Sequence, residues 1–335
     1  MGKGKLLPVL IASPGLMLGS AALYAGDIKV YSHAQVEIAS VDDGTNTATA
    51  VQDNARGRVG VSGSEDLGNG LTGIAMFEFK TDTADNTAGS GTSQASLTGR
   101  EAHVGLKGGF GTLQLGTLKS PYKYSGGIKY DPFVTTFLEA RANGAMTSGA
   151  YGHKSFLANS FSYQTPNING FDGWVAYSLD ESGNSNGDDG DYSLRVMYKQ
   201  DMFEVFLAAV HNNTDQSPVE YDSVKVGGKI KFMKAHSVAG QFEMTESVSA
   251  GSVTTETDLW FLGYTFTMDK TTLVAQMGQT QPDTANTNDT DYYSLGAIYK
   301  FSKTYRVFGG YRSTDNDTVA GEQSVISVGL RMNFG

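Results

Sequence analysis

The sequence predicts an all-β fold, a transmembrane antiparallel β-barrel of about 16 strands. Three observations predict it. After residue 26 the chain repeats segments of roughly ten residues in which apolar and polar side chains alternate, the pattern of a strand with one apolar face. The breaks between these segments are alternately short and long, and the chain opens with an apolar stretch typical of an export signal.

Residues 1–25 have the layout of a secretory signal peptide. Lys3 and Lys5 precede the apolar stretch LLPVLIASPGLMLGSAALYA, after which the chain turns polar. We expect cleavage after Ala25, with Ala22 as the competing site, and a mature barrel domain over residues 26–335. An uncleaved membrane anchor is disfavoured because the apolar core is short and contains Pro14.

Composition and charge exclude several classes of function. The chain has no Cys, so thiol catalysis, Cys-based metal sites and disulfides are excluded. The formal net charge is −10, and without Lys3 and Lys5 the mature chain has 23 basic and 35 acidic residues, a balance of −12. This balance argues against nucleic acid as a partner, since phosphate contacts need clustered Lys and Arg.

Sixteen segments fit the strand pattern, and an even number lets a barrel close with both ends on the periplasmic side. They are 28–40, 56–65, 71–81, 99–107, 112–119, 156–165, 172–180, 191–199, 203–211, 223–232, 236–246, 257–267, 271–280, 291–301, 304–313 and 323–334.

Several segments alternate cleanly. In 71–81, Phe77 and Phe79 lie on one face of an extended chain and Glu78 lies on the other. In 323–334, one face carries Ile326, Val328, Leu330, Met332 and Phe334. Because no helical segment is available to cover the apolar faces and the opposite faces carry charge, we expect lipid to cover them.

The long breaks are rich in Asp, Asn, Thr, Ser and Gly, and they predict outward loops over 41–54, 82–94, 180–190 and 281–290. The acidic runs 183–191 and 283–291 lack the ligand order of an EF-hand. A role in bridging divalent ions to lipopolysaccharide is a minor alternative for them. The five His residues have no metal-site spacing, so no metal and no cofactor are expected.

Four stretches resemble, in the same order and spacing, the general trimeric porins of Gram-negative bacteria. They are RGRVGVSGSEDLGNG (56–70), GREAHVGLKGGFGTLQLGT (99–117), NSFSYQTPNINGF (159–171) and SVGLRMNF (327–334). The resemblance covers the chain from about residue 27 to the end. It implies an outer-membrane homotrimer, in contact with lipid and lipopolysaccharide, for passive diffusion of small hydrophilic solutes and ions. It implies no enzymatic activity, in keeping with the absence of G-x-S-x-G, HExxH and P-loop motifs.

The resemblance also implies a third outer loop that folds into the barrel as a constriction loop. The break over about residues 120–155 occupies that place, and an ordinary surface loop is the alternative. Its central VTTFLEARANG (134–144) favours a short helical turn.

In the family, acidic residues of this loop face arginines of the barrel wall. The resemblance places Arg58 and Arg100 at wall positions, with Arg56 on the same face as Arg58, while a wall arginine of some relatives has no counterpart near Ala158-Asn159. The predicted constriction residues are Arg56, Arg58, Arg100, Asp131, Glu139 and Arg141. The −12 balance predicts a mild preference for cations, although much of the acidic charge lies in outer loops, which would let the sign reverse.

Two alternatives remain open from the sequence. One is a solute-selective channel on the same barrel, and the other is a structural or adhesive outer-membrane barrel that acts through its outer loops. One departure from the family pattern is at the end of the chain, where Gly335 follows the aromatic Phe334.

Overall fold

The computed structural model describes residues 26–84, 97–147, 153–179, 190–213, 219–249, 252–284, 287–317 and 322–335. The predicted signal peptide lies outside these residues, as does most of the acidic run 183–191. Within the described residues, no helix is long and apolar enough to cross a membrane.

Strands follow one another along nearly the whole described chain and form one antiparallel sheet. They are β1 (Ile28–Asp42), β2 (Thr47–Gln52), β3 (Arg58–Gly68), β4 (Leu71–Thr81), β5 (Leu97–Gly108), β6 (Gly111–Lys119), β7 (Phe156–Gln164), β8 (Phe171–Ser178), β9 (Tyr192–Lys199), β10 (Phe203–Asn213), β11 (Val219–Phe232), β12 (His236–Ser249), β13 (Ser252–Met268), β14 (Thr271–Pro282), β15 (Thr290–Lys300), β16 (Tyr305–Asp315) and β17 (Glu322–Phe334).

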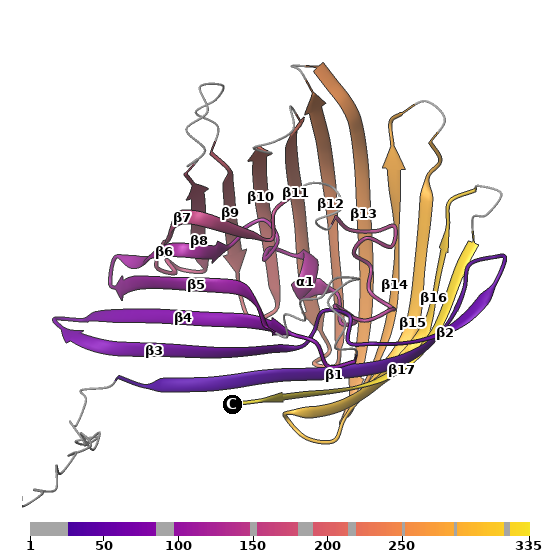
Figure 1. Ribbon diagram of the computed structural model, residues 1–335, viewed down its shortest axis with the longest axis horizontal. Coiled ribbons are helices and arrows are strands. Elements are labelled where there is room, and N and C mark those ends of the chain that lie inside the picture. Colours follow the sequence, from indigo (N-terminus) through magenta and orange to yellow (C-terminus); the bar gives the residue numbers. More distant parts are fainter. Residues whose placement is uncertain are drawn as a thin grey trace, which may run out of the picture.

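The sheet closes on itself between its first and last strands. β1 pairs with β17 from Ser32–Phe334 to Asp42–Ser324. On its other side, β1 pairs with both β3 and β2, which therefore share one position in the wall as a single interrupted strand. The result is a closed barrel of 16 strands, as the sequence predicts (Figure 1).

The prediction of a loop over 41–54 is wrong for most of that segment. Residues 47–52 form β2, and only a short turn separates β2 from β1. The side chains of Asp42 and Asp43 make this turn by accepting hydrogen bonds from the backbone N–H groups of Gly44 and Asn46, at 2.9 and 2.7 Å. Thr and Val in TATAVQ are good strand formers, although the polar composition resembles a loop.

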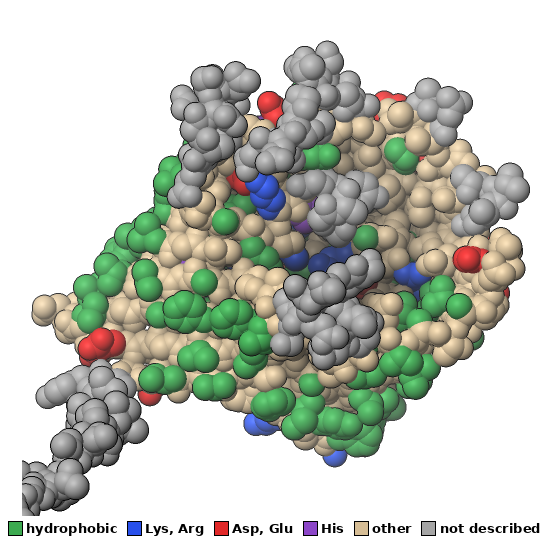
Figure 2. All heavy atoms as spheres, viewed as in Figure 1, with side chains coloured by type: hydrophobic (Ala, Val, Ile, Leu, Met, Phe, Trp, Pro, Cys, Tyr) green, Lys and Arg blue, Asp and Glu red, His purple; other side chains and the backbone are tan. Residues whose placement is uncertain are grey.

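The barrel is apolar outside and polar inside. Phe77 and Phe79 on β4 are 50% and 38% exposed, whereas Glu78 between them is 4% exposed. The predicted outer face of β17, which ends on Phe334, is likewise exposed, while Ser327 and Arg331 are buried. Figure 2 shows hydrophobic side chains spread over the outer wall and Lys and Arg side chains inside the hollow. A soluble protein has the opposite distribution, so lipid is the environment that suits this surface.

The segment between β6 and β7, which we call the inner loop (residues 120–155), lies against the inner wall of the barrel. Its described residues are 120–147 and 153–155. Figure 1 shows its short helix, α1 (Gly127–Tyr130), in the space that the strands enclose. Apolar side chains of the inner loop pack on wall residues of β9–β16 in two buried clusters, which include Tyr122, Tyr130, Phe133, Leu138, Phe206, Phe261 and Phe308.

The expected helical turn over 134–144 is absent, and the helix lies earlier in the inner loop. Residues 134–144 form turns because Thr135 and Ala142 have φ values of 60° and 55°, which a right-handed helix cannot include. Wall glycines make room for this packing. A Cβ at Gly278 would lie 2.3 Å from Ala145 Cβ, and one at Gly296 would lie 2.8 Å from the Phe133 ring.

Candidate functional site

The inner loop covers the wall on the β9–β16 side and leaves open space on the opposite side. There, a cavity of about 530 Å³ lies between the inner loop and strands β1 and β3–β6. We call this cavity the neck. Its charged lining consists of Arg56, Arg58, Arg100, Lys119, Lys123 and Arg141 together with Glu78 and Glu139. Five of the six predicted constriction residues therefore lie around one cavity.

Glu78 is the centre of the charge arrangement on the wall. Alternation along β4 turns its carboxylate inward, where the Arg100 Nε donates a hydrogen bond of 2.9 Å to it. Arg58 on β3 approaches the same oxygen to 3.8 Å, and the Tyr31 hydroxyl donates to the other oxygen at 2.6 Å. One carboxylate thus pairs with two guanidinium groups in the lining of the neck, so that one positive charge remains unbalanced.

Arg56 reaches the neck because the second wall strand is interrupted. Asn54 and Ala55 have φ values of 48° and 56°, and the buried Asp53 carboxylate accepts hydrogen bonds from the N–H groups of Ala55 and Gly57. In the part of the chain that the structure describes, Arg56 has no ion-pair partner. Its charge is therefore also unbalanced.

Two lysines also line the neck, and one of them is paired with a carboxylate. Lys119, at the end of β6, pairs with Glu101 on β5 at 2.5 Å. Lys123 on the inner loop donates a hydrogen bond of 2.5 Å to the Ser155 hydroxyl, which carries no charge. Burial, followed by the neighbouring charges of Arg141 and Arg100, lowers the pKa of the Lys123 ammonium to about 7. Lys123 therefore titrates close to neutral pH.

The loop acid Glu139 is neutralised within the inner loop itself. Arg141 donates hydrogen bonds to one Glu139 oxygen from Nε at 3.1 Å and from a terminal nitrogen at 2.7 Å. The backbone N–H of Thr135 donates to the same oxygen at 2.8 Å. The pair leaves little net negative charge on the loop side to oppose the wall arginines.

Asp131 lies away from the neck. It is 2% exposed, and its carboxylate accepts hydrogen bonds from the N–H groups of Phe133 and Ala140 and from the Gln276 amide on β14. Burial raises the pKa of this carboxyl to about 6. Asp131 thus fastens the inner loop to the wall, at a position from which it does not line the neck.

Sequence reasoning missed Glu78, Glu101 and Tyr31 as parts of the site. The signal for Glu78 was present, because it lies on the polar face of a segment that follows Arg58 by one hairpin. The neck lining together with Glu101 has six basic groups, of which Lys123 titrates near neutral pH, and three carboxylates. The neck is therefore net positive, although the chain as a whole is net negative.

Comparison with known proteins agrees with this architecture. The model of the Gram-negative porin family matches residues 10–319. The chain belongs to the Gram-negative porin family. It is an outer-membrane porin, whose barrel forms a water-filled channel for the passive diffusion of small hydrophilic solutes, and the family is one of channels rather than enzymes.

Individual relatives of this porin are distant. It is 26% identical over 329 residues to the major outer membrane protein P.IB of Neisseria meningitidis serogroup B, a match that covers 90% of each chain. It is 26% identical over 231 residues to P.IB of Neisseria gonorrhoeae, which covers 66% of this chain and 61% of that protein. Among solved structures, the anion-selective porin from Comamonas acidovorans shares the fold, with a TM-score of 0.80, 20% identity, and coverage of 92% of this chain and 99% of that one.

Proposed function

We propose that this porin is a general diffusion channel that prefers anions and works as a homotrimer in the outer membrane. The observation that carries the anion preference is the excess of cations at the neck, where Arg56 and Lys123 lack any carboxylate partner among the described residues. This replaces the mild cation preference predicted from the overall charge.

The effect of a charge on a passing ion depends on the distance between them. Charges in water are screened within about 8 Å at physiological ionic strength, so the groups that line the narrowest part act on a passing ion and distant loop carboxylates act weakly. A net positive neck raises the local concentration of anions and lowers that of cations. The anion-selective porin from Comamonas acidovorans, which shares the fold, supports the same sign.

The mechanism needs only sieving and this field. No bond is made or broken, and no cofactor or metal is part of the proposal. The exposed outer faces suit contact with membrane lipid, while binding of lipopolysaccharide by the outer loops stays a prediction. The family and a Vibrio cholerae porin of similar fold, which has been solved in a trimer form, support the homotrimer.

The test is the zero-current potential of purified porin in a planar bilayer across a KCl gradient. The double variant Arg58→Gln/Arg100→Gln removes two cations and leaves Glu78 without its guanidinium partners, so that the neck keeps four basic groups against three carboxylates. We expect the anion-to-cation permeability ratio to fall about tenfold, the effect of roughly 1.4 kcal/mol on an ion at close range.

The matched control is Lys270→Gln/Lys303→Gln, which removes two cations from short turns remote from the neck lining. We expect the permeability ratio of the control to match that of the wild type. An equal change in both double variants would mean that total charge, rather than the neck, sets the selectivity.

A further inference from the structure

A second group of cations lies at the end of the barrel that has the short turns. The register pairs Glu204 on β10 with Lys199 on β9 and with Lys229 on β11, so these three side chains share one row and one face of the sheet. The row faces inward, because Arg195 and Lys225 lie four residues away on the same strands and are buried inside the barrel. Lys231 follows on β11, two residues nearer the end of the barrel and on the same face.

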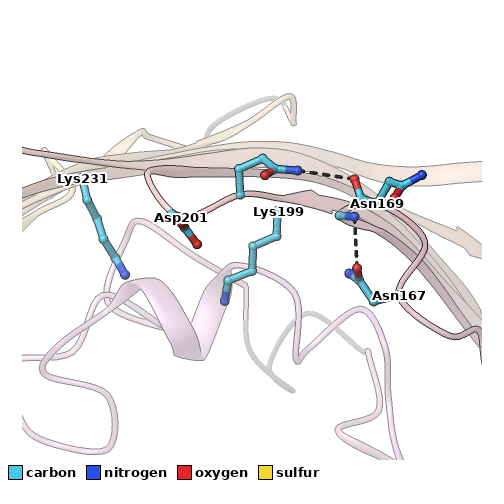
Figure 3. Close-up of a pocket in the computed structure, with 7 residues that line it drawn as sticks. Asn167, Asn169, Lys199, Asp201 and Lys231 are labelled. Carbon is cyan, nitrogen blue, oxygen red and sulfur yellow. Dashed lines mark hydrogen bonds between the residues drawn. The ribbon is translucent and has the colours of Figure 1, made fainter.

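A cavity of about 670 Å³ adjoins this row. Lys199 and Lys231 line it together with Asp201, Asn167, Asn169 and Gln200. Figure 3 shows Lys199 and Lys231 extending to the same side of the sheet, with Asp201 between them and the two asparagines beside Lys199. Two ammonium groups thus lie at one hollow, whereas the Gln200 amide nitrogen donates to the Asn169 carbonyl and the Tyr198 hydroxyl.

The inner loop adds a further cation at the same place. Lys129 lies on the last turn of α1. Its partly enclosed position inside the barrel lowers the pKa of its ammonium, the charges of Arg195 and Lys199 lower it further, and the charge of Glu204 opposes them. Lys129 is therefore close enough to the β9 cations to feel their field. Its own side chain remains exposed to the interior of the channel.

The charges of this group do not cancel. Four ammonium groups, those of Lys129, Lys199, Lys229 and Lys231, lie near two carboxylates, those of Asp201 and Glu204. Glu204 pairs with Lys199 at 3.3 Å. Several N–H donors and a net positive charge around an open hollow are the features that oxyanions require.

We propose that Lys129, Lys199, Lys229 and Lys231 form an anion-binding station at the periplasmic mouth, which holds small phosphate- or carboxylate-bearing solutes as they leave the neck. The proposal rests on the anion preference of the neck for its supply of solute. The neck and the station lie in series, so that an anion can move from one favourable site to the next and neither site has to bind it tightly. The station makes the binding of anions different at the two ends of the channel, because its four cations all lie at the periplasmic end.

Inorganic phosphate is the probe, and the readout is the block of chloride current in a planar bilayer. Phosphate added to each side in turn should reduce the wild-type current at a lower concentration from one side than from the other. In Lys199→Gln/Lys231→Gln we expect the concentration for half block from the sensitive side to rise about fivefold, the effect of losing two close charge contacts in water. The zero-current potential in KCl should stay near that of the wild type, because the neck is unchanged.

Lys270→Gln/Lys303→Gln again serves as the control, and its phosphate block should stay asymmetric. Equal block of Lys199→Gln/Lys231→Gln and wild type, with anion preference present, would overturn the station and leave the proposed function standing. A wild type that prefers cations in KCl would instead overturn the proposed function. Symmetric phosphate block in the wild type would also overturn the station.

Discussion

At the scale of single residues, the surroundings of Lys123 bring the pKa of its ammonium close to neutral pH. Its ammonium lines the neck, has a hydroxyl rather than a carboxylate as partner, and lies near Arg141 and Arg100. These surroundings favour the neutral form, and they bring the pKa to about 7. The neck therefore gains one positive charge below this pH and loses it above.

The expected result is a stronger anion preference at about pH 6 than at about pH 8, since Lys123 in the neck lining loses its charge over this interval. The Asp131 carboxyl, with a pKa of about 6, lies away from the neck. Lys123→Gln should show the weaker preference at both pH values, and Lys123→Arg should show the stronger preference at both. The zero-current potential in a KCl gradient measures each case. A pH dependence of unchanged size in both variants would assign the effect to another group.

At the scale of elements, the inner loop depends on buried hydrogen bonds to the wall. Glu243 on β12 accepts from the Tyr122 hydroxyl at 2.8 Å and from the Thr147 side chain and backbone, at the two ends of the described loop. Arg331 on β17, five strands further along the wall, donates to the Val134 carbonyl at 2.8 Å. The inner loop is thus held to two separate parts of the wall.

Glu243→Ala removes several hydrogen bonds to a buried charge, each worth about 1.5–3 kcal/mol, and leaves their donors unsatisfied. We expect the loop to loosen while the closed sheet remains, seen as larger and noisier single-channel conductance. Glu246→Ala, an exposed carboxylate on the same strand, is the matched control and should behave as the wild type. Quiet channels of wild-type conductance in Glu243→Ala would contradict the role of this contact.

Elements differ in how far the sequence predicts them. Strand faces such as that of β4 follow from alternation with a period of two, and the predicted bounds 71–81 match the structure. β2 was missed because its residues TATAVQ lack an apolar face, and its pairing with β1 decides it instead. The place of the inner loop depends on wall glycines such as Gly278 and on contacts between residues far apart in the sequence, which no local pattern reveals.

At the scale of the whole molecule, net charge and local charge have opposite signs. The chain carries −10, yet the neck gathers Arg56, Arg58, Arg100, Lys119 and Lys123 from separate segments. The sequence identified most of these cations. It could not predict the sign of the field, because that sign depends on Glu139 being neutralised by Arg141 and on the Asp131 side chain being buried between the inner loop and the wall.

The most direct measurement of the central claim is the zero-current potential of the purified wild-type porin in a planar bilayer with a KCl gradient. Because potassium and chloride have nearly equal mobilities in water, the sign of this potential reports the charge of the neck. The cation-rich neck predicts a potential shifted toward the chloride equilibrium value. A potential at zero or shifted toward the potassium equilibrium value would contradict it.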